Sequence, residues 1–334
     1  MRFKENLRNA KNLVAGDKNA IKFFLRLINL PVIGNIYDKK YINFTKNKIK
    51  KHEISITIEP NNVCNLRCIM CPYKDSKRKK ETMPMELFKK IVDESAEIGC
   101  KEIFLTQYNE PFTDRFIFER IKYIRKKGMR SSFYSNAMLL NKKIRKELLE
   151  NPPDWVRFSV DSVNKKTFEE IRTGSNFEKV VENISNLFKE RNEKKQKFPI
   201  IEVFFTVLDK NKHEKSKFLK YWKRKCDFAS LYPVDSRSSE KYVGINYKNL
   251  KPYPCFNPKR VLILSNGKVA LCCVDIDGKI ELGDTRKQTL KEILNSKKYK
   301  EIYKSQLNRK CKIDMCKNCS KFYIDSAFSW WFYD

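Results

Sequence analysis

Three closely spaced cysteines near position 65 are the residues best suited to chemistry. Cys64, Cys68 and Cys71 are separated from one another by three and by two residues. They follow residues 54–58, in which apolar and polar side chains alternate as they do in a half-buried β-strand. The cysteines are therefore expected in a loop at the end of a strand, where three thiolates converge on one inorganic centre.

Three thiolates suit a [4Fe–4S] cluster in which one iron stays open. Four cysteines usually complete such a cluster, so the open iron is available to an exogenous amine and carboxylate, such as those of S-adenosylmethionine (SAM). An electron passed to the bound sulfonium breaks a carbon–sulfur bond and gives a 5′-deoxyadenosyl radical. Zinc is the alternative, but it normally takes four ligands in paired Cys-x2-Cys units, and this loop contains one such pair.

The composition limits the class of protein. A chain of 334 residues holds two or three domains, or one large α/β domain with an appendage. Eleven cysteines without a secretory signal predict a reducing, cytoplasmic location and metal or cluster ligation. No apolar run approaches the length of a membrane span. The net charge of +31 fits an anionic partner, but lysine is spread along the whole chain, so a nucleic acid is not favoured.

Strand-like and helix-like segments alternate from residue 53 onward. Strands are expected at residues 53–59, 102–106, 130–135, 155–160, 200–208 and 228–232. Helical spacing of apolar residues is found at 85–98, 116–127, 142–150, 166–172, 177–194 and 214–225. This alternation predicts an α/β fold, a partial (β/α)6 TIM-like barrel whose active site lies at the carboxyl ends of the strands.

Three regions are expected along the chain. Residues 1–50 are basic and partly amphipathic, which favours a helical extension packed on the barrel over peripheral contact with a membrane. The barrel is expected to occupy residues 51–240. Residues 241–334 are expected to form a small cluster-binding domain with a β-hairpin at Asn266-Gly267 and a helix over 290–303. Cys100 and Cys226 are interpreted as core thiols.

The first cysteine loop resembles the Cys-x3-Cys-x2-Cys signature of the radical SAM superfamily, with Met70 where an aromatic residue is common. Asn109 and Glu110 are similar to the end of the family motif that receives the SAM amino group, although Gln107 and Tyr108 stand where the family has glycines. The same resemblance implies SAM contacts, to the ribose, the methionyl end and the carboxylate, by Ser135, Asn136, Ser159, Asp161 and Arg172.

The C-terminal part resembles the SPASM extension, or the shorter twitch extension, of radical SAM enzymes. This resemblance implies one auxiliary [4Fe–4S] cluster, held by Cys255, Cys272, Cys316 and Cys319. Too few cysteines remain for a second auxiliary cluster. Cys272 and Cys273 are expected on opposite faces of one strand, so that one binds the cluster and the other packs. Cys311 is an extra or alternative ligand, and a zinc site with four cysteines is the alternative for the group.

The predicted function is an enzyme that cleaves SAM reductively and abstracts hydrogen from a substrate carbon, with a flavodoxin- or ferredoxin-type electron donor. A small metabolite of the sugar or cyclitol type is favoured over a ribosomal peptide, because no peptide-recognition domain is evident. Both oxidation and epimerisation stay open, the latter through a thiol such as Cys273 or Cys311 that returns a hydrogen atom. A non-catalytic iron–sulfur or zinc protein that binds RNA is the hypothesis of another class.

Overall fold

The fold is built on one curved sheet that is open at both edges. The structure is a computed structural model that describes residues 54–233, 255, 260–307, 310–317 and 319. Within these residues the sheet has nine strands in the order β6-β5-β4-β3-β2-β1-β7-β8-β9. The strands are β1 (Ser55–Ile58), β2 (Glu102–Phe104), β3 (Arg130–Ser135), β4 (Trp155–Ser159), β5 (Ile200–Val207), β6 (Phe228–Pro233), β7 (Arg260–Ile263), β8 (Lys268–Ala270) and β9 (Glu281–Asp284).

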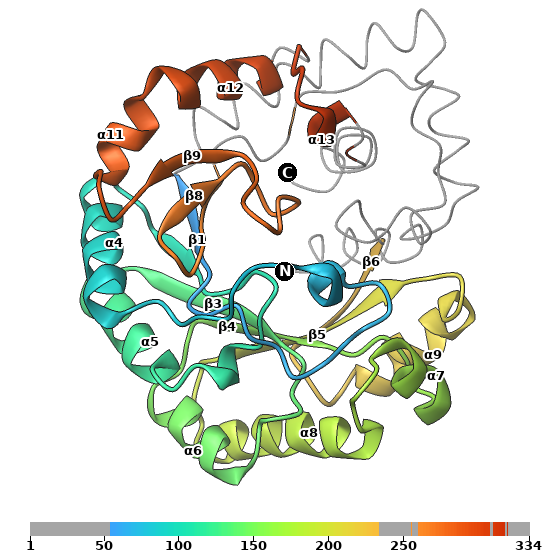
Figure 1. Cartoon of the computed structure of the whole chain (residues 1–334). Helices are drawn as coiled ribbons and strands as arrows, with labels where there is room; N and C mark the ends of the chain where they lie inside the picture. Colours follow the sequence, from blue (N-terminus) through green and yellow to red (C-terminus); the bar gives the residue numbers. More distant parts are fainter. Residues whose placement is uncertain (1–53, 234–254, 256–259, 308–309, 318, 320–334) are drawn as a thin grey trace, which may run out of the picture.

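Helices line the convex side of this sheet (Figure 1). They are α4 (Met85–Glu97), α5 (Ile117–Lys126), α6 (Lys142–Glu150), α7 (Lys165–Ile171), α8 (Phe177–Glu193), α9 (Lys215–Trp222), α11 (Leu290–Asn295) and α12 (Lys297–Leu307). The short helix α13 (Asp314–Lys317) lies apart from this layer, and the loops contain the 3-10 turns η1 (Pro72–Asp75), η2 (Pro111–Thr113) and η3 (Lys212–Glu214). Strands β1 to β6 pair in parallel through helical crossovers. The predicted partial barrel is confirmed.

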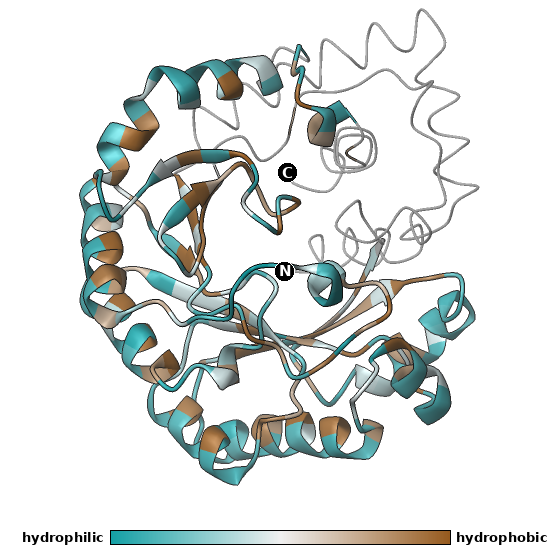
Figure 2. Cartoon of the chain, in the orientation of Figure 1, coloured by the Kyte–Doolittle hydropathy of each residue, from teal (hydrophilic) through white to brown (hydrophobic). Residues whose placement is uncertain are grey.

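The hydrophobic core lies between the sheet and these helices. On β4, Val156 and Phe158 are fully buried against the helices, whereas Arg157 between them points to the concave face. The same alternation separates the core residues Ile201, Val203 and Phe205 of β5 from their neighbours. The helices turn their apolar residues toward the sheet and their polar residues outward (Figure 2). The concave face is therefore the one left for polar chemistry.

Local sequence signals set the helix ends. Asn141, Asn164 and Asn176 cap α6, α7 and α8, each accepting a hydrogen bond from a backbone N–H of the first turn. Gly99 and Gly128 follow α4 and α5 with φ angles of 79° and 74°, a conformation that glycine adopts at little cost. These stops aim each following strand back into the sheet.

The C-terminal part departs from the predicted pattern at two places. The helix expected over 290–303 is interrupted at Ser296, whose extended backbone ends α11 and whose hydroxyl accepts the N–H of Tyr299 in α12. Strand β9 was not predicted, because its sequence Glu-Leu-Gly-Asp lacks β-branched residues. Gly283 is required there, because a Cβ atom would lie 2.6 Å from the side chain of Ile293.

The predicted C-terminal hairpin is part of the main sheet. β7 pairs in parallel with β1, with Thr57 opposite Leu262, and β8 and β9 continue the sheet in antiparallel fashion. The expected helical extension at 1–50 and the expected domain boundary at 240/241 lie outside the described residues. Within the described part of the chain, no helix has the length and apolar character needed to cross a membrane.

Candidate active site

The loop that carries the first three cysteines is held to the barrel by backbone hydrogen bonds. The N–H of Arg67 donates to the carbonyl of Thr173 at 3.0 Å, and the N–H of Ile69 donates to the carbonyl of Ile171 at 2.9 Å. On the other side, the N–H of Glu110 donates to the carbonyl of Val63 at 2.8 Å. The loop is thereby fixed between the end of α7 and the segment after β2, at the carboxyl ends of the strands.

The three cysteines of this loop pack together. Cys64, Cys68 and Cys71 belong to one small apolar group with Leu66, Met70, Ile171 and Leu208. Burial raises the pKa of the Cys64 thiol to about 12, and the neighbouring Cys68 and Cys71 raise it further as like charges. Side chains crowded in this way become thiolates only beside a positively charged partner, which the iron ions of an iron–sulfur cluster supply. The donor set therefore fits a cluster bound by three cysteines.

Glu110 lies at the centre of the polar groups beside this loop. Its buried carboxylate accepts the hydroxyl of Ser135 at 2.8 Å, the N–H of Asn136 at 2.7 Å and the N–H of Phe112 at 3.2 Å. Burial raises the pKa of Glu110 to about 7, although these three donors oppose the shift. The carboxylate is thus poised to change its charge near neutral pH when a cation or an amine approaches.

The raised pKa of Glu110 predicts a pH-dependent stability. Between the ordinary pKa of 4.5 and about 7, the folded state binds the proton and the unfolded state does not, so stability is greatest below the ordinary pKa and falls as the pH rises to about 7. Relative to Glu110→Gln, the wild type should lose about 2–3 kcal/mol of unfolding free energy between pH 5 and pH 8. Denaturant unfolding of both proteins measures this difference, and parallel pH profiles would contradict it.

Asn109 and its two predecessors bind neighbouring protein segments. Asn109 donates from Nδ2 to Asn61 at 3.2 Å and accepts the N–H of Gln107 at 2.8 Å. Gln107 and Tyr108, which stand where the superfamily motif has glycines, both donate to the carbonyl of Cys273, at 3.1 and 2.9 Å. The two residues that replace the glycines therefore connect this segment to the C-terminal cysteines.

The segment after β3 brings its predicted residues to the cluster loop. Asn136 donates from Nδ2 to the side chain of Asn65 at 2.9 Å, and Ser135 accepts the N–H of Ala137 at 3.0 Å. Ala137 is fully buried with a φ of 60°, so it keeps the left-handed backbone that a glycine would adopt with less strain. Its carbonyl accepts the side-chain amide of Asn183 at 2.9 Å, which holds this conformation in place.

Asp161 and Arg172 form a buried ion pair that contacts the cluster loop. Arg172 Nη2 lies 2.6 Å from Asp161 Oδ2, and Arg172 Nη1 lies 3.7 Å from the sulfur of Cys68. Burial alone would lower the pKa of Arg172, but the carboxylate of Asp161 together with Cys68 and Cys71 raises it, so the guanidinium stays charged. Thr206 of β5 donates its N–H to Asp161 at 2.6 Å. Ser159, also buried, ends β4 two residues before Asp161.

The C-terminal cysteines form a second group. Cys255, Cys272, Cys311, Cys316 and Cys319 pack with Leu271, Ile302 and Met315. Burial raises the pKa of the Cys316 thiol, and the adjacent Cys311 and Cys255 also raise it. The donor set again fits an iron–sulfur cluster. Among the described residues, no three His, Cys, Asp or Glu side chains are placed to hold a single metal ion.

The expectation that Cys272 and Cys273 lie on one strand is wrong. β8 ends at Ala270, and a turn follows in which the N–H of Asp275 donates to the carbonyl of Cys272 at 3.0 Å. Cys272 packs within the C-terminal cysteine group, whereas the carbonyl of Cys273 is directed to Gln107 and Tyr108. Because of this turn, the two neighbouring cysteines have different surroundings.

Several polar residues near the site are not among those predicted from the sequence. Asn61 and Asn65 hold the motif residues to the cysteine loop, and their place beside Cys64 is the only sequence signal for them. Arg157 and Glu202 form an ion pair at 3.1 Å on the concave face. A carboxylate in the largely apolar strand β5, opposite an arginine of β4, is a usable signal.

Two family models match the chain, one over each of the regions that contain the cysteine groups. The model of the radical SAM superfamily matches residues 58–209, and the model of SPASM, an iron–sulfur cluster-binding domain, matches residues 255–320. The chain belongs to the radical SAM superfamily of enzymes and carries a C-terminal SPASM domain. Membership implies SAM and a [4Fe–4S] cluster in the first region and auxiliary iron–sulfur binding in the second, which favours iron over the zinc alternatives.

Curated relatives match the chain over part of its length. A tungsten-containing aldehyde ferredoxin oxidoreductase cofactor-modifying protein from Pyrococcus furiosus is 29% identical over 169 residues, which are 49% of this chain and 46% of the relative. A GTP 3',8-cyclase from Clostridium perfringens is 30% identical over 164 residues, 48% of this chain and 50% of the relative. The chain thus spans about half the length of these relatives.

Solved structures share the fold. anSMEcpe with bound AdoMet has a TM-score of 0.59 at 20% identity, covering 84% of this chain and 96% of that one. SuiB of Streptococcus suis, bound to S-adenosylmethionine, has a TM-score of 0.56 at 14% identity, covering 84% and 75%. BtrN in complex with AdoMet and 2-DOIA has a TM-score of 0.51 at 19% identity, covering 80% and 93%. At these identities the likeness concerns the fold.

Proposed function

We propose that the protein cleaves SAM reductively to a 5′-deoxyadenosyl radical that abstracts hydrogen from a carbon of a small, anionic substrate. A [4Fe–4S] cluster on Cys64, Cys68 and Cys71 supplies the electron for cleavage. A flavodoxin- or ferredoxin-type protein reduces that cluster. The auxiliary cluster is assigned to Cys255, Cys272, Cys316 and Cys319, with Cys311 as an extra or alternative ligand.

The single observation that carries this proposal is the contact between Arg172 and Cys68. One guanidinium lies 3.7 Å from a cluster cysteine and 2.6 Å from the carboxylate of Asp161. The nitrogen that is not paired with Asp161, Nη1, faces the loop where SAM would bind through its amine and carboxylate. Arg172 is therefore assigned to the SAM carboxylate, and Glu110 with Ser135, Asn136 and Asn109 to the side of the SAM amino group.

Within the barrel, Ser159 and Asp161 are assigned to the ribose and the methionyl end of SAM. Ser159 ends β4, one step beyond Arg157 on the same concave face of the sheet, and Asp161 follows two residues after the strand. A molecule held beneath SAM would therefore meet Arg157 and its neighbours. This order along the strand supports a substrate site deeper in the barrel than SAM.

The environment of Arg157 supports an anionic substrate. Its guanidinium lies 4.8 Å from the ring centre of Trp155 and 5.4 Å from that of Tyr134. Its Nε donates to Glu202, but its buried Nη1 has no hydrogen-bond partner among the described residues. A buried donor of this kind needs an acceptor. A carboxylate or phosphate of the substrate supplies one, with the planar guanidinium suited to bind two oxygens.

Replacing Arg157 tests this substrate site. Anionic metabolites such as nucleotides, sugar phosphates and hydroxy acids should be screened for those that raise the rate of 5′-deoxyadenosine formation. For an active compound, Arg157→Gln should raise the KM about 10- to 100-fold, because a charge-assisted hydrogen bond contributes about 1.5–3 kcal/mol. Arg157→Lys should recover part of the loss.

A matched control is provided by Arg145, which pairs with Glu190 at 2.9 Å between helices on the convex side. Arg145→Gln removes a similar arginine–glutamate pair and should leave the KM within about twofold. Equal KM values for both variants would show that Arg157 does not bind the substrate.

The outcome of the radical step is tested with a substrate deuterated at the reacting carbon. Transfer of deuterium into 5′-deoxyadenosine would support hydrogen abstraction, and its absence would overturn that part of the proposal. Oxidation would yield a product two hydrogens lighter, with the auxiliary cluster as electron acceptor. Epimerisation would instead incorporate solvent hydrogen and would depend on Cys273 or Cys311 as the thiol that donates it.

A further inference from the structure

The exposed rim of the cluster loop is strongly basic. Directly after Cys71, the short turn η1 leads into a segment in which Lys74, Lys77, Lys79 and Lys80 are exposed. Arg67, between the first two cluster cysteines, is exposed as well. These five residues and Lys279 are called the basic rim below.

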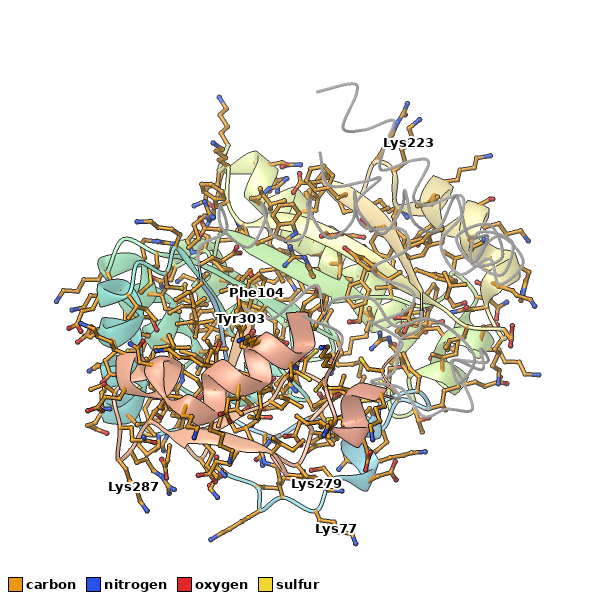
Figure 3. The ribbon with its side chains drawn as sticks, turned by 90° about the horizontal axis from the view of Figure 1, so that it is seen from above. Lys77, Phe104, Lys223, Lys279, Lys287 and Tyr303 are labelled. Atoms are coloured by element: carbon orange, nitrogen blue, oxygen red, sulfur yellow. The ribbon has the colours of Figure 1, made fainter. Side chains whose placement is uncertain are left out.

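Contacts join the basic rim into one surface. Lys80 Nζ lies 4.0 Å and the Arg67 guanidinium 4.9 Å from the centre of the same ring, that of Tyr73. Ser76 donates to Asp277 at 2.9 Å, which brings the turn that carries Lys279 beside the segment that carries Lys77. Figure 3 shows Lys77 and Lys279 pointing outward along one edge of the molecule. The rim therefore spans the first cysteine loop and the SPASM domain.

Within the described part of the chain, the charges of the basic rim are not neutralised by ion pairs. Over the described ranges, none of its six cations pairs with a carboxylate, and the exposed carboxylate within the segment is Asp75. On the outer helices some exposed lysines have partners, as in Lys127–Asp93 at 2.8 Å and Lys165–Glu178 at 2.9 Å, whereas others have none among the described residues. The rim is set apart by its position, because six exposed cations gather beside the first cysteine loop.

A short path connects the basic rim to the cluster loop. The ring of Tyr73 lies under Lys80 and Arg67, and its hydroxyl accepts the N–H of Cys64 at 2.9 Å. Arg67 also donates to the carbonyl of Cys64 at 2.9 Å. A protein that docks on the rim is therefore separated from a cluster ligand by one side chain. This placement suits electron delivery rather than substrate binding, which belongs to the concave face.

We propose that the basic rim is the docking surface for an acidic electron-transfer protein of the flavodoxin or ferredoxin type. This inference rests on the proposed function. The reduced donor gives up one electron and the cluster of the protein accepts it. Complementary charges steer such partners together and raise association rates by about 10- to 1,000-fold, an effect that salt weakens.

Charge reversal at the rim tests the proposal. The triple variant Lys74→Glu, Lys77→Glu, Lys79→Glu should bind an acidic flavodoxin at least about tenfold more weakly than the wild type at low salt. Reduction by flavodoxin should slow by a similar factor, and the difference should shrink at about 1 M salt, where the Debye length falls to about 3 Å. Binding is measured by titration calorimetry with the full chain, and a ferredoxin is tested in parallel.

The matched control reverses three exposed lysines at another edge of the molecule, Lys217, Lys220 and Lys223 of α9 and its end. Figure 3 shows Lys223 at the opposite edge from Lys77. The control triple carries the same change in net charge and should bind both donors within about twofold of the wild type. Dithionite, a small reductant that needs no docking surface, should reduce all three proteins equally.

Three outcomes would overturn the docking proposal. In the first, the two triple variants lose flavodoxin and ferredoxin binding equally. In the second, the rim variant binds both donors as the wild type does. In the third, the rim variant keeps donor binding but loses salt-sensitive retention on RNA, which would make the rim a nucleic-acid surface. Failure of the proposed function differs from failure of the docking proposal. If the proposed function is wrong, SAM is not cleaved with dithionite as reductant, whether or not the donor protein binds.

Discussion

Replacing Cys68 by alanine is expected to remove the first cluster and to abolish SAM cleavage. Cys68 is the most buried of the three loop cysteines and the one that Arg172 contacts. Two thiolates cannot hold a cluster that three hold with one iron already open. Iron and sulfide content should fall by about one cluster per chain. Formation of 5′-deoxyadenosine should fall at least about 1,000-fold, below detection, because the reaction loses its essential cofactor.

The control for this variant is Cys226→Ala. Cys226 is also buried, and burial likewise raises the pKa of its thiol to about 12, but its sulfur lies 3.2 Å from the carbonyls of both Trp222 and Phe228 in the core. This variant should keep its iron, its visible absorption and its SAM cleavage. Retention of a full first cluster in Cys68→Ala, or equal iron loss in both variants, would refute the assignment of the loop.

Replacing Asp161 by asparagine should destabilise the protein and weaken SAM binding together. The carboxylate is fully buried 2.6 Å from Arg172, so its removal leaves an uncompensated guanidinium, at a cost of about 3–5 kcal/mol. Without its partner, Arg172 is also no longer held against Cys68. Unfolding measurements should show the stability loss, and SAM affinity should fall at least about tenfold, a factor equal to 1.4 kcal/mol.

Asp227 supplies the comparison for this ion pair. It pairs with the buried Arg191, accepting Nη2 at 2.9 Å, at a position remote from the cysteine loops and with 27% of its side chain exposed. Asp227→Asn should therefore destabilise the protein less than Asp161→Asn and should leave SAM affinity within about twofold. A similar loss of SAM affinity in both variants would show that instability, and not the position of Arg172, causes the effect.

The sequence predicted most of the barrel because each element carries a local signal. Apolar spacing placed α4 and α8 within one residue at each end, and glycine at 99 and 128 marked the helix stops. The parallel arrangement followed from the alternation of strands and helices. The cysteines of the first loop were recognised because their chemistry depends on spacing within eight residues.

Contacts between distant segments were the part that local signals could not predict. Gln107 and Tyr108 reach the carbonyl of Cys273, more than 160 residues away in the sequence. In the sequence alone, these two residues only indicate that the glycines of the motif are absent. In the fold they join the SAM motif to the turn beside the auxiliary cysteines, so the missing glycines correspond to a new connection between the two cluster regions.

Strand β9 and the break at Ser296 were missed for a related reason. Gly283 is a poor strand residue by propensity, and its use is explained by the close approach of Ile293 in α11. Ser296 is compatible with a helix interior until its hydroxyl is seen to cap α12. In both cases tertiary packing overrides a weak local preference.

SAM cleavage by the anaerobically reconstituted protein tests the central claim most directly. The protein, with its first cluster shown to be filled and reduced by electron paramagnetic resonance, is incubated with SAM and dithionite. We expect SAM to alter the spectrum of the reduced cluster, and 5′-deoxyadenosine to accumulate in the wild type but not in Cys68→Ala. A reduced cluster whose spectrum SAM leaves unchanged, with no 5′-deoxyadenosine formed, would contradict it.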